Sequence, residues 1–208
     1  MECSQDILRD HPVNIERIAR GEAPATMIWL FWGTGRVPEM PPFKQLYGMD
    51  AAMTSGVDLL RGLARMTGME VLDIQGVTDN IDNDYRAQAA GALEALEEKD
   101  LVVIHIEATD EAGHDGAIDD KIEAIQQVDK EVVSRLRTWR PGELRVLIMP
   151  DHATPIETRT HTDDLVPFML CGPGFSSKDT RRFTELEAGK TGLFISEDQN
   201  IMKWLLAR

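Results

Sequence analysis

Apolar residues recur along the chain in two patterns, short continuous runs and stripes at helical spacing, and the two patterns alternate. The continuous runs predict buried strands at residues 27–32, 69–74, 101–106, 144–149 and 166–171. The stripes predict helices over residues 51–66 and 118–139, and a segment rich in Ala, Leu and Glu predicts a third helix over residues 85–99. This alternation is typical of an α/β fold with one mostly parallel sheet and helices on both faces.

The ends of the chain are more polar than this central alternation. Residues 1–21 predict short helical pieces that are interrupted at Pro12, with Asn14 as the N-cap of the second piece. Residues 175–192 predict irregular structure, and Ser196 predicts the start of a last helix. At 208 residues, the chain is long enough to bury one substantial core.

The charge balance narrows the classes of partner. The chain carries 22 Lys and Arg against 36 Asp and Glu, a formal charge of −14, which argues against nucleic acid and anionic membranes and is compatible with divalent cations. No apolar run reaches the ~18 residues of a membrane span, and the first residues lack the hydrophobic core of a signal peptide. The two cysteines form no CxxC motif, so a reducing cytoplasm is the expected location.

Carboxylates and histidines follow two of the predicted strands directly. Asp110 and His114 are four residues apart, so on a helical turn both would lie on one face. Asp151 and His152 follow a later strand, and His161 comes nine residues after His152. Because ligands gather beyond the carboxyl ends of parallel strands, we expect all five side chains at one edge of the sheet. Three of them, Asp110, His114 and His161, would make one metal site, and the other two would contribute to a second ion nearby.

The mixture of carboxylate and imidazole ligands suits manganese or zinc better than magnesium or calcium. Two such ions can clamp the attacking and leaving oxygens of a phosphoryl transfer. An Asp-His pair in a loop is by itself more often a hydrogen-bonded turn, so the prediction depends on the combined motifs. His105 lies inside an apolar run and is interpreted as an interior histidine, whereas Glu107 either supports the ligands from behind or is solvated.

Three motifs, D-E-A-G-H-D-G, P-D-H-A-T-P and R-T-H-T-D, resemble the metal-binding half of the alkaline phosphatase superfamily. More narrowly, the chain from His11 to Phe168 resembles the archaeal-type cofactor-independent (2,3-bisphosphoglycerate-independent) phosphoglycerate mutases. That family interconverts 3-phosphoglycerate and 2-phosphoglycerate through a phosphoserine enzyme, in glycolysis. The resemblance implies an alkaline-phosphatase-like core, two divalent ions without 2,3-bisphosphoglycerate, and a phosphoglycerate-type substrate. It implies that one ion is bound by Asp110, His114 and His161. The other ion is bound by Asp151 and His152.

The resemblance covers only the C-terminal half of the family. Its members take the serine nucleophile, one aspartate ligand and most of an insert domain from an N-terminal segment that residues 1–208 do not match. Each serine here lies far from the metal motifs in sequence: Ser4, Ser55, Ser134, Ser176, Ser177 and Ser196. We therefore expect the nucleophile to come from outside this chain, and the expected partners are a separate N-terminal half or further copies in a homo-oligomer. Apolar surface near residues 27–32 or 101–106 would then lie uncovered.

A second departure lies at Trp32, where many archaeal members have an arginine that could meet a substrate phosphate. Arg36 or Arg61 could replace it, and Arg61 is preferred because its stretch resembles a basic substrate-contact position of the family; the alternative is an exposed helical arginine. Two other functions stay open. One is a phosphatase or phosphodiesterase with water as acceptor, and the other is a non-catalytic metal-binding fragment.

Overall fold

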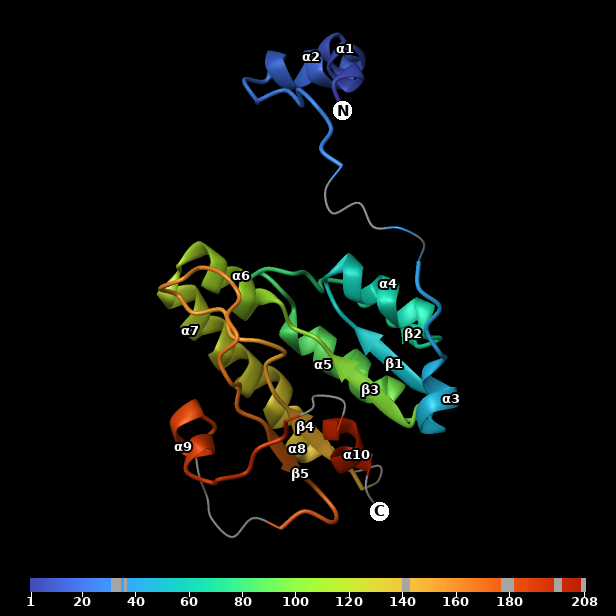
Figure 1. Cartoon of the computed structure of the whole chain (residues 1–208), viewed down its shortest axis with the longest axis vertical. Helices are drawn as coiled ribbons and strands as arrows, with labels where there is room; N and C mark the ends of the chain where they lie inside the picture. Colours follow the sequence, from blue (N-terminus) through green and yellow to red (C-terminus); the bar gives the residue numbers. More distant parts are fainter. Residues whose placement is uncertain (31–34, 36, 140–142, 177–181, 197–199, 207–208) are drawn as a thin grey trace. The chain divides into compact units, whose positions relative to one another are not determined.

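The computed structural model describes the whole chain except residues 31–34, 36, 140–142, 177–181, 197–199 and 207–208 (Figure 1). The chain divides into two units, Met1–Glu39 and Met40–Arg208. Among the described residues, no helix is both long and apolar enough to cross a membrane.

The first unit contains α1 (Cys3–Arg9) and α2 (Pro12–Ala19). The N-cap of α2 is His11, whose Nδ1 accepts the Val13 N–H, and not Asn14 as predicted. Pro12 opens the helix because it has no N–H to leave unpaired. Asn14 is buried instead, and its side chain donates to the Leu8 carbonyl at 2.6 Å and exchanges two bonds with the Ala25 backbone. This contact ties α2 to the extended segment that follows it.

The strand predicted at residues 27–32 is not found in its described part. Residues 27–30 have no strand partner, and Trp29 and Leu30 are largely exposed. Residues 31 and 32 lie outside the described residues. The apolar run alone could not distinguish a strand from an extended segment, because a strand also needs a neighbour to pair with.

The second unit is built on a parallel sheet of β1 (Ala51–Thr54), β2 (Glu70–Val71) and β3 (Leu101–Ile104), in the order β2-β1-β3. β1 and β3 pair in register over their whole length, from Ala51↔Leu101 to Thr54↔Ile104. The prediction of one helix over residues 51–66 is therefore wrong in its first part. Helix begins only with α4 (Asp58–Met66), after Gly56, where the Thr78 backbone packs so closely that a Cβ would clash with the Thr78 carbonyl carbon.

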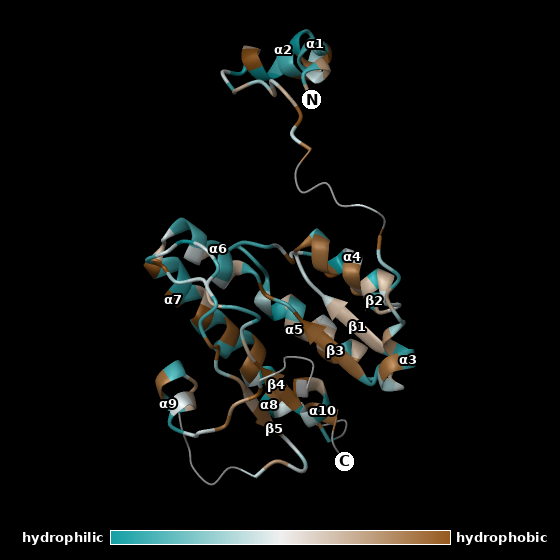
Figure 2. Cartoon of the chain, viewed as in Figure 1, coloured by the Kyte–Doolittle hydropathy of each residue, from teal (hydrophilic) through white to brown (hydrophobic). Residues whose placement is uncertain are grey.

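Helices cover both faces of this sheet (Figures 1 and 2), as the alternating pattern predicted. α4 packs against β1 and β2, and the predicted helix α5 (Tyr85–Ala95) packs against β1 and β3. Met53 and Val103 contact the core on the α4 side, whereas Ile104 contacts the core around α5. This alternation is the period of two that a strand buried on both faces requires.

The predicted helix over residues 118–139 is nearly continuous. It begins as α7 (Ile118–Gln127), widens into the π-helical stretch η1 (Val128–Val133), and ends as α8 (Ser134–Thr138). α5 packs against η1 and α8, and the buried side chains Tyr85, Ala89, Ala108, Ala124 and Val132 form the core between them.

The predicted strands at residues 144–149 and 166–171 form a separate antiparallel pair, β4 (Val146–Ile148) with β5 (Met169–Cys171). The described strands therefore make two sheets, a parallel one of three strands and an antiparallel one of two, where a single sheet was expected. Three short helices lie elsewhere in the described part of the unit: α3 (Phe43–Tyr47), α9 (Glu185–Gly189) within the segment predicted as irregular, and α10 (Asn200–Leu206) near the C-terminus.

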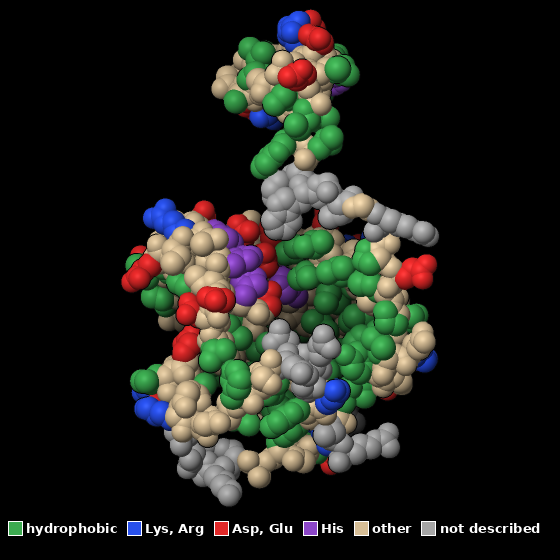
Figure 3. Space-filling model, in the orientation of Figure 1, with side chains coloured by type: hydrophobic (Ala, Val, Ile, Leu, Met, Phe, Trp, Pro, Cys, Tyr) green, Lys and Arg blue, Asp and Glu red, His purple; other side chains and the backbone are tan. Residues whose placement is uncertain are grey.

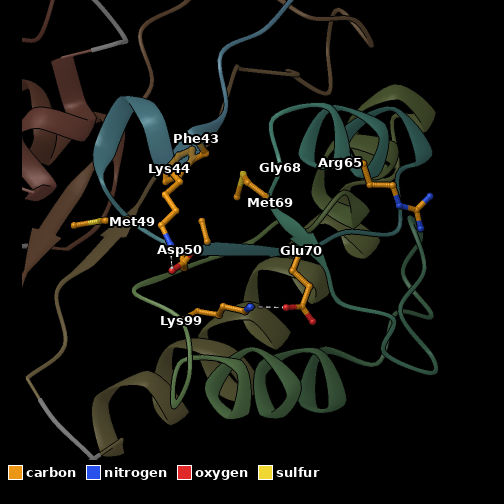
Figure 4. Close-up of a pocket in the computed structure, with 10 residues that line it drawn as sticks. Phe43, Lys44, Met49, Asp50, Arg65, Gly68, Met69, Glu70 and Lys99 are labelled. Atoms are coloured by element: carbon orange, nitrogen blue, oxygen red, sulfur yellow. Dashed lines mark hydrogen bonds and ion pairs between the residues drawn. The ribbon is translucent and has the colours of Figure 1, made fainter.

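Different side chains stand at the two ends of the parallel strands. Beyond the carboxyl ends, histidines and carboxylates gather on one face of the second unit (Figure 3). At the amino ends lies a cavity of about 280 Å³ whose charges are largely balanced (Figure 4). Lys44 pairs with Asp50 and Lys99 pairs with Glu70, both at 2.6 Å. The histidine-rich end is therefore the candidate for chemistry.

Candidate metal centre

The short helix α6 (Ala108–Asp115) begins directly after β3 and carries the first two predicted ligands. Asp110 lies in its first turn, where a carboxylate is favoured by the helix dipole. His114 lies one turn later on the same face, with its Nε2 3.1 Å from the Asp110 Oδ2. The spacing of four residues therefore produces the contact that was expected from it.

The loop after β4 brings two more histidines to the same point. An isolated antiparallel bridge pairs Ala153 with Thr162 and holds their neighbours side by side. The His161 Nε2 lies 3.1 Å from the His114 Nε2 and 3.5 Å from the Asp110 Oδ1. The His152 and His161 rings stack with centroids 3.7 Å apart. Asp110, His152 and His161 can each offer a ligand atom within 4.8 Å of the others.

Asp151 stands apart from this group. Its side chain is 67% exposed, and its carboxylate contacts the His152 Nε2 at 3.4 Å. The expected division into two ligand sets is therefore less sharp than predicted, because the His152 Nδ1 also lies 3.9 Å from the Asp110 Oδ1. Four of the five predicted ligands converge, and Asp151 lies at the edge of the group.

The orientation of His114 identifies which of its ring nitrogens is free. Its Nδ1 lies 3.0 Å from the Arg159 carbonyl oxygen, which can only accept, so the Nδ1 carries the hydrogen. In the neutral ring, the Nε2 then presents a lone pair to Asp110 and His161. The His114 Nε2 and the Asp110 Oδ2 are then two acceptors 3.1 Å apart, which repel each other unless a proton or a metal ion lies between them. The donor set therefore fits a cation, in the tautomer that metal-bound histidines adopt.

Thr154 and Lys121 fix the Asp110 carboxylate, and sequence reasoning missed both. The Thr154 hydroxyl donates to the Asp110 Oδ1, and the Lys121 Nζ donates to the Thr154 carbonyl at 2.6 Å. Gly113 makes this packing feasible, because a Cβ on it would lie only 2.6 Å from the Thr154 carbonyl oxygen. Thr154 lies inside one of the quoted motifs and Lys121 lies outside all of them, and nothing in the sequence indicated that the two residues meet.

The electrostatics also favour a cation. Burial raises the pKa of the Glu107 carboxyl to about 7, and the charges of Asp110 and Asp151 add to this shift. Glu107, Asp110 and Glu111 can bring carboxylate oxygens within 4.8 Å of one another. Carboxylates this close destabilise one another's charged forms, and a divalent ion would remove that repulsion.

Behind the ligands, Ser55 contacts His105, although Ser55 lies far from the metal motifs in sequence. Ser55 follows β1 and His105 follows β3, and the Ser55 Oγ lies 3.0 Å from the His105 Nδ1. The His105 Nε2 lies 3.2 Å from the Glu107 Oε2. Ser55 is fully buried, so it cannot meet a substrate as a nucleophile. His105 is the interior, hydrogen-bonded histidine that was predicted.

Arg61 lies on α4 next to the end of β1. Its guanidinium donates to the Ser55 carbonyl at 3.4 Å and pairs with Asp73 at 3.6 Å, and its side chain is largely buried. Arg61 is thus held in place rather than extended into solvent as an ordinary surface arginine. The other candidate for a phosphate contact, Arg36, lies outside the described residues, as does Trp32.

Comparison with known proteins decides the family. Residues 9–205 match the family model described as the Metalloenzyme superfamily. The chain belongs to this superfamily. The ligand groups at the strand ends agree with that membership.

Individual relatives confirm the predicted resemblance to phosphoglycerate mutases. The chain is 44% identical to the 2,3-bisphosphoglycerate-independent phosphoglycerate mutase of Methanothrix thermoacetophila, over 100% of this chain and 53% of the relative. It is 41% identical to the second such mutase of Methanothermobacter thermautotrophicus, over 98% of this chain and 50% of the relative. The chain thus spans about half the length of the curated relatives that it matches.

Solved structures agree with this fold. A protein from Pyrococcus horikoshii is 33% identical and superimposes with a TM-score of 0.78, over 89% of this chain and 49% of its own. The cofactor-independent phosphoglycerate mutase from Thermoplasma acidophilum has a TM-score of 0.63 at 24% identity, over 99% of this chain and 48% of its own. At that identity the second likeness supports the alkaline-phosphatase-like fold alone.

Proposed function

We propose that this chain is the metal-binding part of a cofactor-independent phosphoglycerate mutase. In this proposal, it takes part in the interconversion of 3-phosphoglycerate and 2-phosphoglycerate in cytoplasmic glycolysis. The observation that carries the proposal is the convergence of Asp110, His114 and His161 with the free Nε2 of His114 facing the carboxylate. The similarity to mutases over the whole chain supports this choice of substrate.

The chain's own residues would hold two divalent ions, manganese or zinc. Asp110, His114 and His161 would bind one ion, and Asp151 and His152 would contribute to the other. When bound, the ions would stabilise the negative charge of a phosphoryl group in transfer. Thr154 orients Asp110, and the Arg159 carbonyl orients His114, so the ligands would be held in place before an ion arrives.

Arg61 would contact the phosphate or carboxylate of the substrate. Its position at the carboxyl end of β1 supports this role, because ligands of α/β sheets lie beyond that edge. A guanidinium binds such oxyanions through paired hydrogen bonds. We propose that the serine nucleophile and a further aspartate ligand come from polypeptide outside these 208 residues, so that residues 1–208 act as the C-terminal part of an alkaline-phosphatase-like domain.

The proposed ligand set can be tested by titrating the chain with Mn²⁺ in a calorimeter. We expect His114→Ala to lower the affinity by about 10-fold or more, because even the partners that orient metal ligands contribute this much. His11→Asn is the matched control, since it also removes one histidine but leaves a side chain that can cap α2. Equal affinities for wild type and His114→Ala would refute the assignment.

A coupled assay can separate the mutase from the other phosphoryl-transfer chemistry. With 3-phosphoglycerate as substrate, a mutase forms 2-phosphoglycerate, whereas a phosphatase releases inorganic phosphate. Phosphate release without 2-phosphoglycerate, by the chain together with the N-terminal half of a relative, would overturn the proposed reaction but leave the metal site standing.

A further inference from the structure

Three polar side chains form a continuous chain across the ends of β1 and β3. The two strands pair in register up to Thr54↔Ile104, so the residues that follow them, Ser55 and His105, lie next to each other. The Ser55 Oγ lies 3.0 Å from the His105 Nδ1, and the His105 Nε2 lies 3.2 Å from the Glu107 Oε2. These contacts thus link a buried hydroxyl to a carboxylate through one imidazole ring.

The contacts of Ser55 decide the direction of these hydrogen bonds. The Val57 N–H donates to the Ser55 Oγ at 3.0 Å, so the hydroxyl already has a donor. Because Ser55 is fully buried, its hydroxyl hydrogen needs an acceptor, and among the described residues the acceptor that it contacts is the His105 Nδ1, which is therefore unprotonated. The ring hydrogen of neutral His105 is therefore on the Nε2, where it is donated to Glu107.

A second set of buried amides fixes the backbone of His105. The Gln88 Nε2 donates to the His105 carbonyl at 2.9 Å, and the Gln88 Oε1 accepts from the Asn83 Nδ2 at 2.9 Å. Gln88 is fully buried and Asn83 nearly so. Because buried polar groups destabilise the fold unless their hydrogen bonds are satisfied, this arrangement holds the His105 backbone in one position.

Glu107, at the end of the chain, lies beside the proposed metal ligands. Its carboxylate and those of Asp110 and Glu111 can approach within 4.8 Å of one another. A serine–histidine–carboxylate sequence also occurs in hydrolases, but there the serine must meet the substrate. Ser55 is fully buried, so the three hydrogen-bonded side chains position one another and do not serve nucleophilic attack.

We propose that Ser55 and His105 are positioning residues that hold the Glu107 carboxylate beside Asp110, where it adds negative charge to the cation site. The inference rests on the proposed function, because it assigns these residues to the same metal centre. It predicts that a hydroxyl with no contact to any metal ligand controls metal affinity through the histidine tautomer.

The tautomer can be measured in the metal-free chain by long-range ¹H–¹⁵N correlation NMR of the imidazoles. The chain has only five histidines, and His105→Gln assigns the signal in question. We expect the Nε2–H form in the wild type, and a loss of this preference in Ser55→Ala. Thr54→Val is the matched control, because Thr54 is an equally buried neighbour whose hydroxyl has no hydrogen-bond partner within the described part of the chain. An Nδ1–H form in the wild type, or no change in Ser55→Ala, would overturn the proposed hydrogen bonds from Ser55 through His105 to Glu107.

Titration with Mn²⁺ tests its consequence for the site. We expect Ser55→Ala and Glu107→Ala each to lower the affinity about 10-fold, and Thr54→Val to leave it unchanged. The double variant Ser55→Ala/Glu107→Ala should bind no more weakly than Glu107→Ala, because both changes act through the same series of hydrogen bonds. Glu107→Gln should keep the tautomer, since its amide oxygen still accepts, yet lower the affinity by removing the charge. Multiplicative effects in the double variant would overturn the inference.

The two levels of failure can be told apart. A wild-type chain that binds no Mn²⁺ would refute the proposed function. The tautomer is measured in the metal-free protein. It therefore shows whether Ser55 and His105 orient Glu107, whatever the result of the Mn²⁺ titration. Because Ser55→Ala could unfold the chain, each variant is checked by circular dichroism. Glu107→Ala tests the same hydrogen bonds at a less buried residue. It removes the acceptor of the His105 Nε2–H and should therefore also weaken the preference for that tautomer.

Discussion

Two neighbouring hydroxyls at the end of β1 are both fully buried, and only one of them is satisfied. Ser55 has hydrogen bonds on both sides, whereas the Thr54 Oγ1 has no partner within the described residues. An unpaired buried hydroxyl destabilises the native state, so Thr54→Val should raise the free energy of unfolding by about 1 kcal/mol. Urea unfolding would measure this as a higher midpoint at unchanged slope. A lower midpoint would mean that the Thr54 hydroxyl has a partner after all.

Thr154 allows a sharper test at the ligand itself. Its hydroxyl donates to Asp110, so Thr154→Val should free the carboxylate and lower Mn²⁺ affinity about 10-fold. Thr154→Ser keeps the hydroxyl and should bind nearly as well as the wild type. Calorimetry of both variants would separate the hydrogen bond from the packing of the methyl group. Equal losses in the two variants would assign the effect to packing.

At the residue scale, the sequence indicated ligands better than the groups that hold them. Asp110 and His114 are recognisable as ligands from their spacing of four residues on a helix, which is a local pattern. The residues that orient them act over long separations in sequence. Thr154 is 44 residues from Asp110, and Arg159 is 45 residues from His114. Such contacts follow from the tertiary fold, which one sequence without a structure does not specify.

At the element scale, the clearest error was the first part of residues 51–66. Ala51 and Ala52 favour helix by propensity, yet they form β1, because small side chains fit the buried centre of a sheet that is covered on both faces. The helical spacing begins only after Gly56. By contrast, α5 and β3 formed where they were predicted, since propensity and burial agree there. Local preference therefore sufficed only where the tertiary environment favoured the same structure.

The glycines of α4 and α6 give a matched pair of tests at this scale. A Cβ on Gly62 would meet nothing within 4 Å, so Gly62→Ala should stabilise the chain by about 0.5–1 kcal/mol through helix propensity alone. The same change at Gly113 would place a Cβ 2.6 Å from the Thr154 carbonyl oxygen. We expect Gly113→Ala to destabilise the chain by about 1–3 kcal/mol and to weaken Mn²⁺ binding, because Thr154 must move away from Asp110. Stabilisation by both changes in urea unfolding would contradict the close packing of α6 on the Thr154 loop.

For the molecule as a whole, β3 bears on the prediction of uncovered apolar surface near residues 101–106. Within the described residues, β3 pairs only with β1, and each of its four residues is partly exposed although all are apolar. In the other unit, Trp29 and Leu30 are largely exposed. The open edge of a parallel sheet can accept a further strand through its unpaired backbone groups. A strand from the remaining half of a mutase-like domain would satisfy this edge.

The last prediction concerns turnover by the 208 residues alone. Transfer through a phosphoserine needs a nucleophile that reaches the metal ligands. In the described part of the chain, only Ser55 among the serines is linked to the site, and it is fully buried. We therefore expect little or no 2-phosphoglycerate from this chain with Mn²⁺. Addition of the N-terminal half of the Methanothrix thermoacetophila relative should restore turnover if that half supplies the serine and docks on β3. A version of that half with every serine at the site changed to alanine is the control, because it should still dock without restoring activity. Full turnover by the chain alone would show that one of its own serines reaches the metal ligands.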